Sequence, residues 1–316
     1  MITELLAAAV LVYSGSQNVG LTGFADGKMH VDFGSEIDQM SASGDHDPLV
    51  FRICCGESVM SPDGTIWYST GSAVVRVRHD QLRTRDVFPF QLASALAAGP
   101  DGSLWFNSHD RFLTHIDANG LVQKFVDPHS AYSPRWGTDR IVVSNDGAAW
   151  CESYVDAFLA RVDVTGATTI ASGPNYHFVD LIAPARLGGV WVRFGVENNQ
   201  RMDAVDHVAE TLPMSLDWFV ETNDGAIWYG SGSEITQWKS GTITRIPLPA
   251  ALPPQYFFTL SEMTPESDTT IWVRTNANLP VPSGTSAEMS ATSTPVDTVH
   301  VYRIIVPANA KRHAAR

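Results

Sequence analysis

The stretch SPDGTIWYST, at residues 61–70, occurs four times in the chain with small changes. It returns as GPDGSLWFNS at 99–108, SNDGAAWCES at 144–153 and TNDGAIWYGS at 222–231. Asp-Gly is a strong short signal for a tight β-hairpin turn, and the residues that follow it here are typical of a strand. The repeat therefore predicts a hairpin that the chain forms again and again.

The tryptophan of each DGxxW unit marks the period of this repeat. Weaker copies, LGGVW and DTTIW, fill the gaps, and the markers are then Trp67, Trp105, Trp150, Trp191, Trp228 and Trp272. Neighbouring markers are 37 to 45 residues apart, and each period contains four short apolar runs between turns. Such a period without helical periodicity is typical of a β-propeller with four-stranded blades, the architecture of WD40 and NHL propellers.

The N-terminal segment predicts one more blade. Residues 12–33 align without a gap on residues 67–88, which places Val12 at the marker position. On this alignment the apolar run at 5–13 forms the first two strands of a blade rather than a signal peptide, and nine residues are too few for a membrane span. We therefore predict an all-β, seven-bladed propeller in a single domain over residues 1–316.

Two stretches fall outside the predicted repeat. Residues 34–49 are interpreted as a long link between the first and second blades. Residues 280–298 are rich in Ser, Thr and Pro, and we predict a disordered loop there. The last unit shows three strands and no evident fourth, so the sequence leaves the closure of the ring open.

The composition bears on the partners. The formal charge is −13, with four lysines among the 21 basic residues, and an acidic chain repels phosphate backbones. We therefore expect no nucleic acid partner, and we expect a monomer that binds a small-molecule or carbohydrate-like ligand. The scarcity of lysine and the nine tryptophans favour an exported bacterial protein over a cytoplasmic one.

With GPDGSLWFNS, and with TRIPLP closing a later unit, the chain resembles the virginiamycin B lyase (streptogramin lyase) family. The resemblance covers nearly the whole chain. It implies a seven-bladed propeller and, in the family, elimination from a cyclic ester by a histidine base, with Mg²⁺ held near glutamates.

The family's catalytic positions hold other residues in this chain. The family histidine lies about eleven residues before the marker, where this chain has Gly56, Ser94, Asp139, Asp180 and Asp217, with Phe258 nearest in the last unit. The family glutamate lies three residues after the marker, where this chain has Thr70, Ser108, Ser153, Phe194, Ser231 and Thr275. The family's catalytic residues are therefore not carried over.

Three of these positions suggest a cation site. Asp139, Asp180 and Asp217 each precede their marker by eleven residues, in three consecutive units. Equivalent positions lie side by side around a propeller axis, and clustered carboxylates attract a hard cation such as Mg²⁺ or Ca²⁺. The alternative is structural: each carboxylate accepts hydrogen bonds from backbone N–H groups of the neighbouring blade.

Other candidates lie in segments expected at the same rim. Two residues after their markers, Asn107, Glu152 and Arg193 are predicted ligand contacts. His109, His177 and Glu152 are the candidates for a catalytic base. Trp136 and Trp218 flank inner strands and suit stacking against a sugar or a flat ring. Solvated surface positions and packing between blades are the structural alternatives for these residues.

The sequence thus leaves three functions open. The first is a ligand-binding or sensory propeller that uses the rim of the channel. The second is a metal-dependent C–O lyase or lactonase acting on a cyclic ester, and the third is a protein-interaction scaffold. A fold alone does not choose between them.

Overall fold

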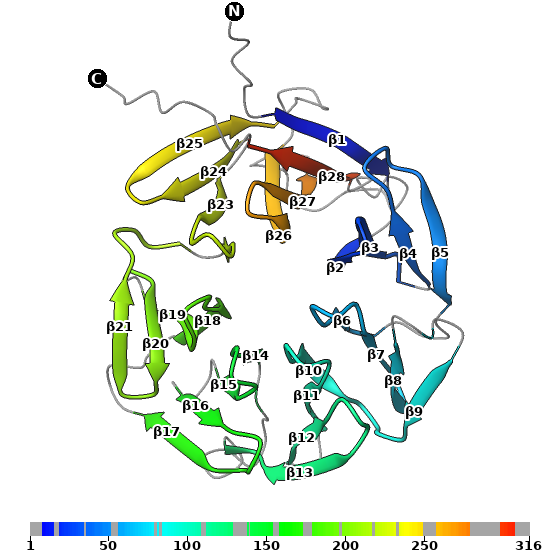
Figure 1. The fold of residues 1–316 in the computed structure, drawn as a ribbon, viewed down its shortest axis with the longest axis vertical. Helices are drawn as coiled ribbons and strands as arrows, with labels where there is room; N and C mark the ends of the chain where they lie inside the picture. Colours follow the sequence, from blue (N-terminus) through cyan, green and yellow to red (C-terminus); the bar gives the residue numbers. More distant parts are fainter. Residues whose placement is uncertain are drawn as a thin grey trace, which may run out of the picture.

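The computed structural model describes residues 8–15, 19–34, 36–51, 56–78, 81, 84–108, 112–128, 138, 140–153, 158–172, 179–195, 198–216, 219–231, 234–248, 257–278 and 298–306. These residues form seven four-stranded antiparallel sheets arranged as a ring (Figure 1). The protein is therefore a seven-bladed β-propeller, as predicted. Within the described ranges, no helix combines the length and hydrophobicity that a membrane span needs.

Six blades are each made of four consecutive strands. Blade 1 consists of β2 (Gly20–Ala25), β3 (Lys28–Asp32), β4 (Glu36–Met40) and β5 (His46–Phe51). Blade 2 consists of β6 (Ser58–Met60), β7 (Ile66–Thr70), β8 (Ala73–Val77) and β9 (Arg85–Phe88). Blade 3 consists of β10 (Ser94–Ala98), β11 (Leu104–Asn107), β12 (Phe112–Ile116) and β13 (Val122–Val126). Blade 4 consists of β14 (Arg140–Val143), β15 (Ala149–Ser153), β16 (Phe158–Val162) and β17 (Thr168–Ser172).

The remaining blades complete the ring. Blade 5 consists of β18 (Val179–Pro184), β19 (Val190–Phe194), β20 (Gln200–Ala204) and β21 (His207–Thr211). Blade 6 consists of β22 (Val220–Glu221), β23 (Ile227–Ser231), β24 (Glu234–Lys239) and β25 (Thr242–Pro247). Blade 7 combines β26 (Phe257–Ser267), β27 (Thr270–Asn278) and β28 (Thr298–Ile305) with β1 (Ala8–Gly15). In each blade, the strand that is named first above lies nearest the axis of the ring (Figure 1).

The last blade takes its outer strand from the other end of the chain. β1 pairs antiparallel with β28, from Ala8 opposite Ile305 to Gly15 opposite Val299. The prediction that the run at 5–13 forms the first two strands of a blade is therefore wrong, and so is the marker at Val12. The missing fourth strand of the last unit is β1, which closes the ring.

Blade 1 begins later in the sequence than predicted. Its first hairpin turns at Asp26 and Gly27, whose φ angles of 51° and 75° suit a turn that needs two left-handed residues. His30, fully buried, occupies the marker position of this blade. Residues 34–49, predicted to be a link, contain β4 and most of β5. Of the predicted loop 280–298, residues 280–297 lie outside the described residues and Thr298 begins β28.

The six marker tryptophans are buried, as predicted, with at most 1% of their surface exposed. Each indole fills the wedge between neighbouring sheets, and several also bind the next blade through Nε1. Trp67 donates to the carbonyl oxygen of Gly102 at 3.2 Å, and Trp105 donates to that of Gly147 at 3.1 Å. Gly102 and Gly147 belong to the Asp-Gly turns of the following blades. In blades 2 and 3 the repeated unit therefore supplies both the turn and the contact that links one blade to the next.

Candidate functional site

A row of polar residues lies at one level of the inner hairpins. The residue two positions after the marker faces an inner-strand residue, and we call these pairs the polar belt. Its described members are Gly20 with Asp32, Glu57 with Ser69, Ser94 with Asn107, Arg140 with Glu152, Asp180 with Arg193, and Glu262 with Arg274. The polar belt lies near the end of the propeller axis at which the inner strand of each blade begins.

The charged pair of blade 5 joins two residues that the sequence assigned to different roles. Arg193 donates to Oδ2 of Asp180 through Nε at 3.2 Å and through a terminal nitrogen at 2.5 Å. The Arg193 side chain is 17% exposed and that of Asp180 is 31% exposed. A guanidinium that binds a carboxylate with two nitrogens is held in a fixed plane. The pair is thus ordered, yet solvent still reaches it.

Blade 4 carries a second pair of charges beside the first. Arg140, on the inner strand β14, lies opposite Glu152 on β15. Glu152 is buried, with 7% of its surface exposed. β14 neighbours β18 around the ring, so the charged residues of blades 4 and 5 lie on adjacent inner hairpins. The inner strands of these two blades therefore carry opposite charges at this level, Arg140 on β14 and Asp180 on β18.

An equal offset from the marker does not give equal register in blades 4 and 5. β18 contains a bulge between Leu181 and Ala183, whereas the register of β14 is continuous. The inner residue at the belt level is therefore eleven residues before the marker in blade 5 but ten before it in blade 4, where it is Arg140. The premise that one offset gives one height is wrong. Asp139 and Asp217 themselves lie outside the described residues.

In the described part of the chain, no three His, Cys, Asp or Glu side chains lie close enough together to bind a metal ion. Within those ranges, Asp180 is the member of the predicted arc that can be placed, and its carboxylate already binds Arg193. Trp136, Trp218, His109 and His177 lie outside the described residues.

Asn107 contacts the connection to the next blade. Its Nδ2 donates to the carbonyl oxygen of Thr138 at 3.2 Å, and Asn107 is buried. Thr138 in turn donates to the buried carboxylate of Asp127 through its backbone N–H and its hydroxyl. The chain therefore enters blade 4 through a fixed set of hydrogen bonds beside Arg140.

Two belt glutamates bind the backbone of the following blade. Oε2 of Glu57 accepts from the N–H of Leu96 at 2.9 Å, and Oε2 of Glu262 accepts from the N–H of Leu21 at 2.5 Å. Both acceptors lie ten residues before their markers, and both donors lie at or beside an irregularity of an inner strand. This is the structural role considered for the aspartates, found instead at a ten-residue offset. That offset, shared with Arg140, is the sequence signal that marks the belt position on these inner strands.

Glu262 has an unusual environment. Burial raises the pKa of its carboxyl, although the N–H of Leu21 and Arg274 at 2.8 Å act in the opposite direction. Gly20 leaves room beside it, because a Cβ there would lie 3.9 Å from both carboxylate oxygens. Asp32 is close by and accepts from the hydroxyl of Ser58 at 2.6 Å. The seam between blades 7 and 1 therefore holds a compact polar group.

The fold and the belt define a class: a seven-bladed propeller with charged pairs around one end of its axis. No protein-family model and no curated protein matches the sequence. Solved structures do match. A streptogramin B lyase superposes with a TM-score of 0.65 at 14% identity, over 95% of this chain and 99% of the other.

Two further structures show the same likeness. A catalytically inactive virginiamycin B lyase from Staphylococcus aureus, with quinupristin, has a TM-score of 0.63 at 12% identity, over 95% and 99% of the two chains. YCF48 bound to D1 peptide has a TM-score of 0.60 at 11% identity, over 95% of each chain. At such identities the likeness establishes the shared propeller fold.

Proposed function

We propose that the protein is a ligand-binding propeller whose site lies at the belt end of blades 4 and 5. The observation that carries the proposal is the pair Asp180–Arg193, ordered by two hydrogen bonds and still reached by solvent. A ligand carboxylate can exchange with Asp180 on the guanidinium of Arg193, since arginine binds carboxylates in a planar, two-point fashion.

The chemistry of the belt favours a small polar ligand that carries one carboxylate. Arg140 and Arg193 attract such a group, whereas Glu152 and Asp180 accept hydrogen bonds from hydroxyl groups. Trp136 and Trp218, proposed here as stacking partners for a ring, occur in the sequence next to inner-strand starts. A sugar acid combines these features, and we propose that class of ligand.

Calorimetric titration with glucuronate and glucose tests the proposal. We expect glucuronate to bind and glucose to bind at least about tenfold more weakly, because the neutral sugar lacks the group that Arg193 recognises. Arg193→Gln should remove the difference. The matched control is Arg303→Gln, since Arg303 also pairs with a glutamate, Glu266, but at the level of a marker tryptophan. Equal binding of both sugars, or equal loss in both variants, would contradict the proposal.

Calorimetric titration with metal ions distinguishes this function from that of a metal-dependent lyase or lactonase. That alternative needs Mg²⁺ or Ca²⁺ at Asp180, with Asp139 and Asp217 as further ligands. We expect neither ion to give heat that Asp180→Ala abolishes, because Arg193 already neutralises this carboxylate. Cation binding that disappears in Asp180→Ala would favour the enzyme instead.

A further inference from the structure

The outer strand of blade 3 exposes more apolar surface than an edge strand normally does. Val122 and Val126 of β13 are 38% and 68% exposed, and Leu121 before them is 61% exposed. Each of the other described outer strands contributes at most one exposed large apolar side chain. β13 lies on the perimeter of the ring and ends its sheet (Figure 1). Edge strands are usually protected by charges, prolines or covering segments.

The exposed residues of β13 lie in a row on one face of the sheet. Alternate residues of β13 point to the same side of the sheet, and Val122, Lys124 and Val126 form the more exposed set. This set faces blade 2, because it pairs with the residues of β12 that include Ile116, which packs against blade 2. Two valines therefore flank a lysine along the edge. The spacing is that of alternate residues on one side of a strand.

The connection from blade 2 to blade 3 extends this surface. The ammonium of Lys124 lies 5.3 Å from the ring centre of Phe90 and 5.4 Å from that of Phe112. Leu92, two residues after Phe90, is 62% exposed and has a left-handed backbone, with φ at 54°. We call the five residues Phe90, Phe112, Val122, Lys124 and Val126 the β13 patch. It combines aromatic and aliphatic surface with one cation.

We propose that the edge of β13 docks an extended segment of a partner protein, in which an acidic residue has an aliphatic residue two positions away on each side. A strand added antiparallel to β13 places its alternate side chains directly opposite Val122, Lys124 and Val126. Aliphatic residues then meet the valines, and the carboxylate meets the ammonium of Lys124. The surrounding negative charge of the chain is screened beyond about 8 Å at physiological ionic strength.

Charge decides between a partner segment and a second copy of this chain. In a two-fold pairing of two β13 edges about their centre, Lys124 would face Lys124, and like charges directly opposite each other are destabilising. An acidic segment instead meets the lysine with the opposite charge. The patch therefore fits a different chain better than its own copy.

Two labelled peptides test this proposal by fluorescence anisotropy with the full chain. One is Ser-Val-Thr-Glu-Thr-Val-Ser, and the other has Lys in place of Glu. We expect the Glu peptide to bind about fivefold more tightly, the effect of one exposed charge pair. Lys124→Glu should reverse the preference. Val126→Asp should weaken both peptides, whereas Val208→Asp on β21, where Val208 is 44% exposed, should change neither.

Several outcomes would overturn the proposal. These are no binding of either peptide, equal affinity for both, an unchanged preference in Lys124→Glu, and equal losses in the β13 and β21 variants. Self-association that Val126→Asp abolishes and the Glu peptide does not inhibit would assign the patch to a second copy. Melting curves show whether Val126→Asp is folded, and Lys124→Glu decides the question if it is not.

Discussion

The marker tryptophans show how one repeated residue performs more than one task. Every marker indole is buried in the wedge between two sheets, but the partner of its N–H differs from blade to blade. Trp105 donates to Gly147 of the next blade, and Trp191 donates to the carboxylate of Glu221, also in the next blade. In the described part of the chain the buried Nε1 of Trp228 has no acceptor. All marker tryptophans therefore fill the wedge between sheets, whereas the hydrogen bond made by the indole N–H differs from one blade to another.

This difference can be measured with one substitution at two sites. Trp105→Phe removes the hydrogen bond to the carbonyl of Gly147, whereas Trp228→Phe removes an N–H that has no acceptor among the described residues. Both substitutions also replace the indole with a smaller aromatic side chain. We expect Trp105→Phe to lower the free energy of unfolding by about 1 kcal/mol more than Trp228→Phe does, in urea denaturation. Equal losses would show that the bond to Gly147 contributes nothing.

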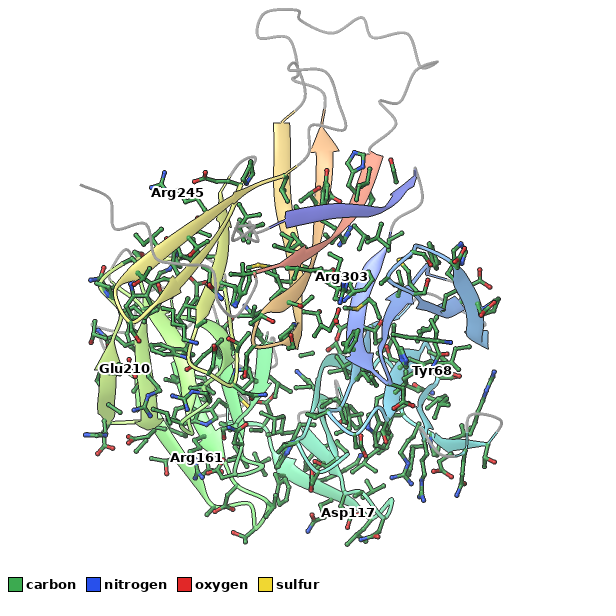
Figure 2. The ribbon with its side chains drawn as sticks, turned by 45° about the horizontal axis from the view of Figure 1, so that its top comes forward. Tyr68, Asp117, Arg161, Glu210, Arg245 and Arg303 are labelled. Atoms are coloured by element: carbon green, nitrogen blue, oxygen red, sulfur yellow. The ribbon has the colours of Figure 1, made fainter. Side chains whose placement is uncertain are left out.

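At the scale of an element, β26 carries two glutamates whose environments act in opposite directions. Burial raises the pKa of Glu262. Burial also acts to raise that of Glu266, but the hydrogen bonds from Arg303 and Trp272 outweigh it and hold the pKa below its usual value. Arg303 lies on β28, next to the outermost strand of blade 7, and Figure 2 shows Glu210 and Arg245 at the periphery of the ring. The surroundings of β26 thus raise the pKa of the acid near the belt and lower the pKa of the acid toward the other end of the strand.

The two shifts predict opposite pH dependences. A raised folded pKa gives stability that is present below the unfolded pKa and is lost as pH rises through the folded value. A lowered one gives stability that is present above the unfolded pKa and is lost as pH falls through the folded value. As pH falls from roughly 7 toward the ordinary glutamate value of about 4.3, the wild type should therefore gain stability relative to Glu262→Gln. As pH falls further below that value, the wild type should lose stability relative to Glu266→Gln. Urea unfolding at four pH values measures both, and parallel curves would contradict the assignment.

At the scale of the whole molecule, β1 joins the two ends of the described chain. It is the outer strand of blade 7, where Ala9 packs against the core shared by blades 6 and 7. Val12 packs against the core shared by blades 7 and 1. A ring closed in this way has its last sheet completed by a strand from the opposite end of the sequence. Loss of that strand opens an edge on β28 and exposes two cores.

Truncation tests this closure. Deleting residues 1–15 removes β1, and we expect the free energy of unfolding to fall by at least about 2 kcal/mol because apolar contacts on both faces are lost. Deleting residues 1–7 leaves β1 in place and serves as the control. The urea midpoint of each form measures the effect. Equal midpoints for the two deletions would mean that β1 does not hold the ring together.

Local chemistry explains what the sequence predicted about the fold. A glycine with positive φ, as at Gly64 and Gly102, and a large residue three positions later are signals contained within one hairpin. Because every hairpin needs the same turn and the same wedge, the period and the class of fold follow from reading the chain alone. The burial of Trp67 and its equivalents follows for the same reason.

The tertiary structure decided what depends on distant partners. The pairing of β1 with β28 joins strands almost 300 residues apart, and nothing within 5–13 indicates which edge that run completes. The bulge in β18 moves Asp180 to the belt level, whereas Arg140 takes that level in β14. Whether a carboxylate meets a guanidinium, as at Asp180, or a backbone N–H of the next blade, as at Glu262, depends on how neighbouring sheets are placed. Hairpin turns depend on a few adjacent residues, but strand register and inter-blade contacts depend on residues that only folding brings together.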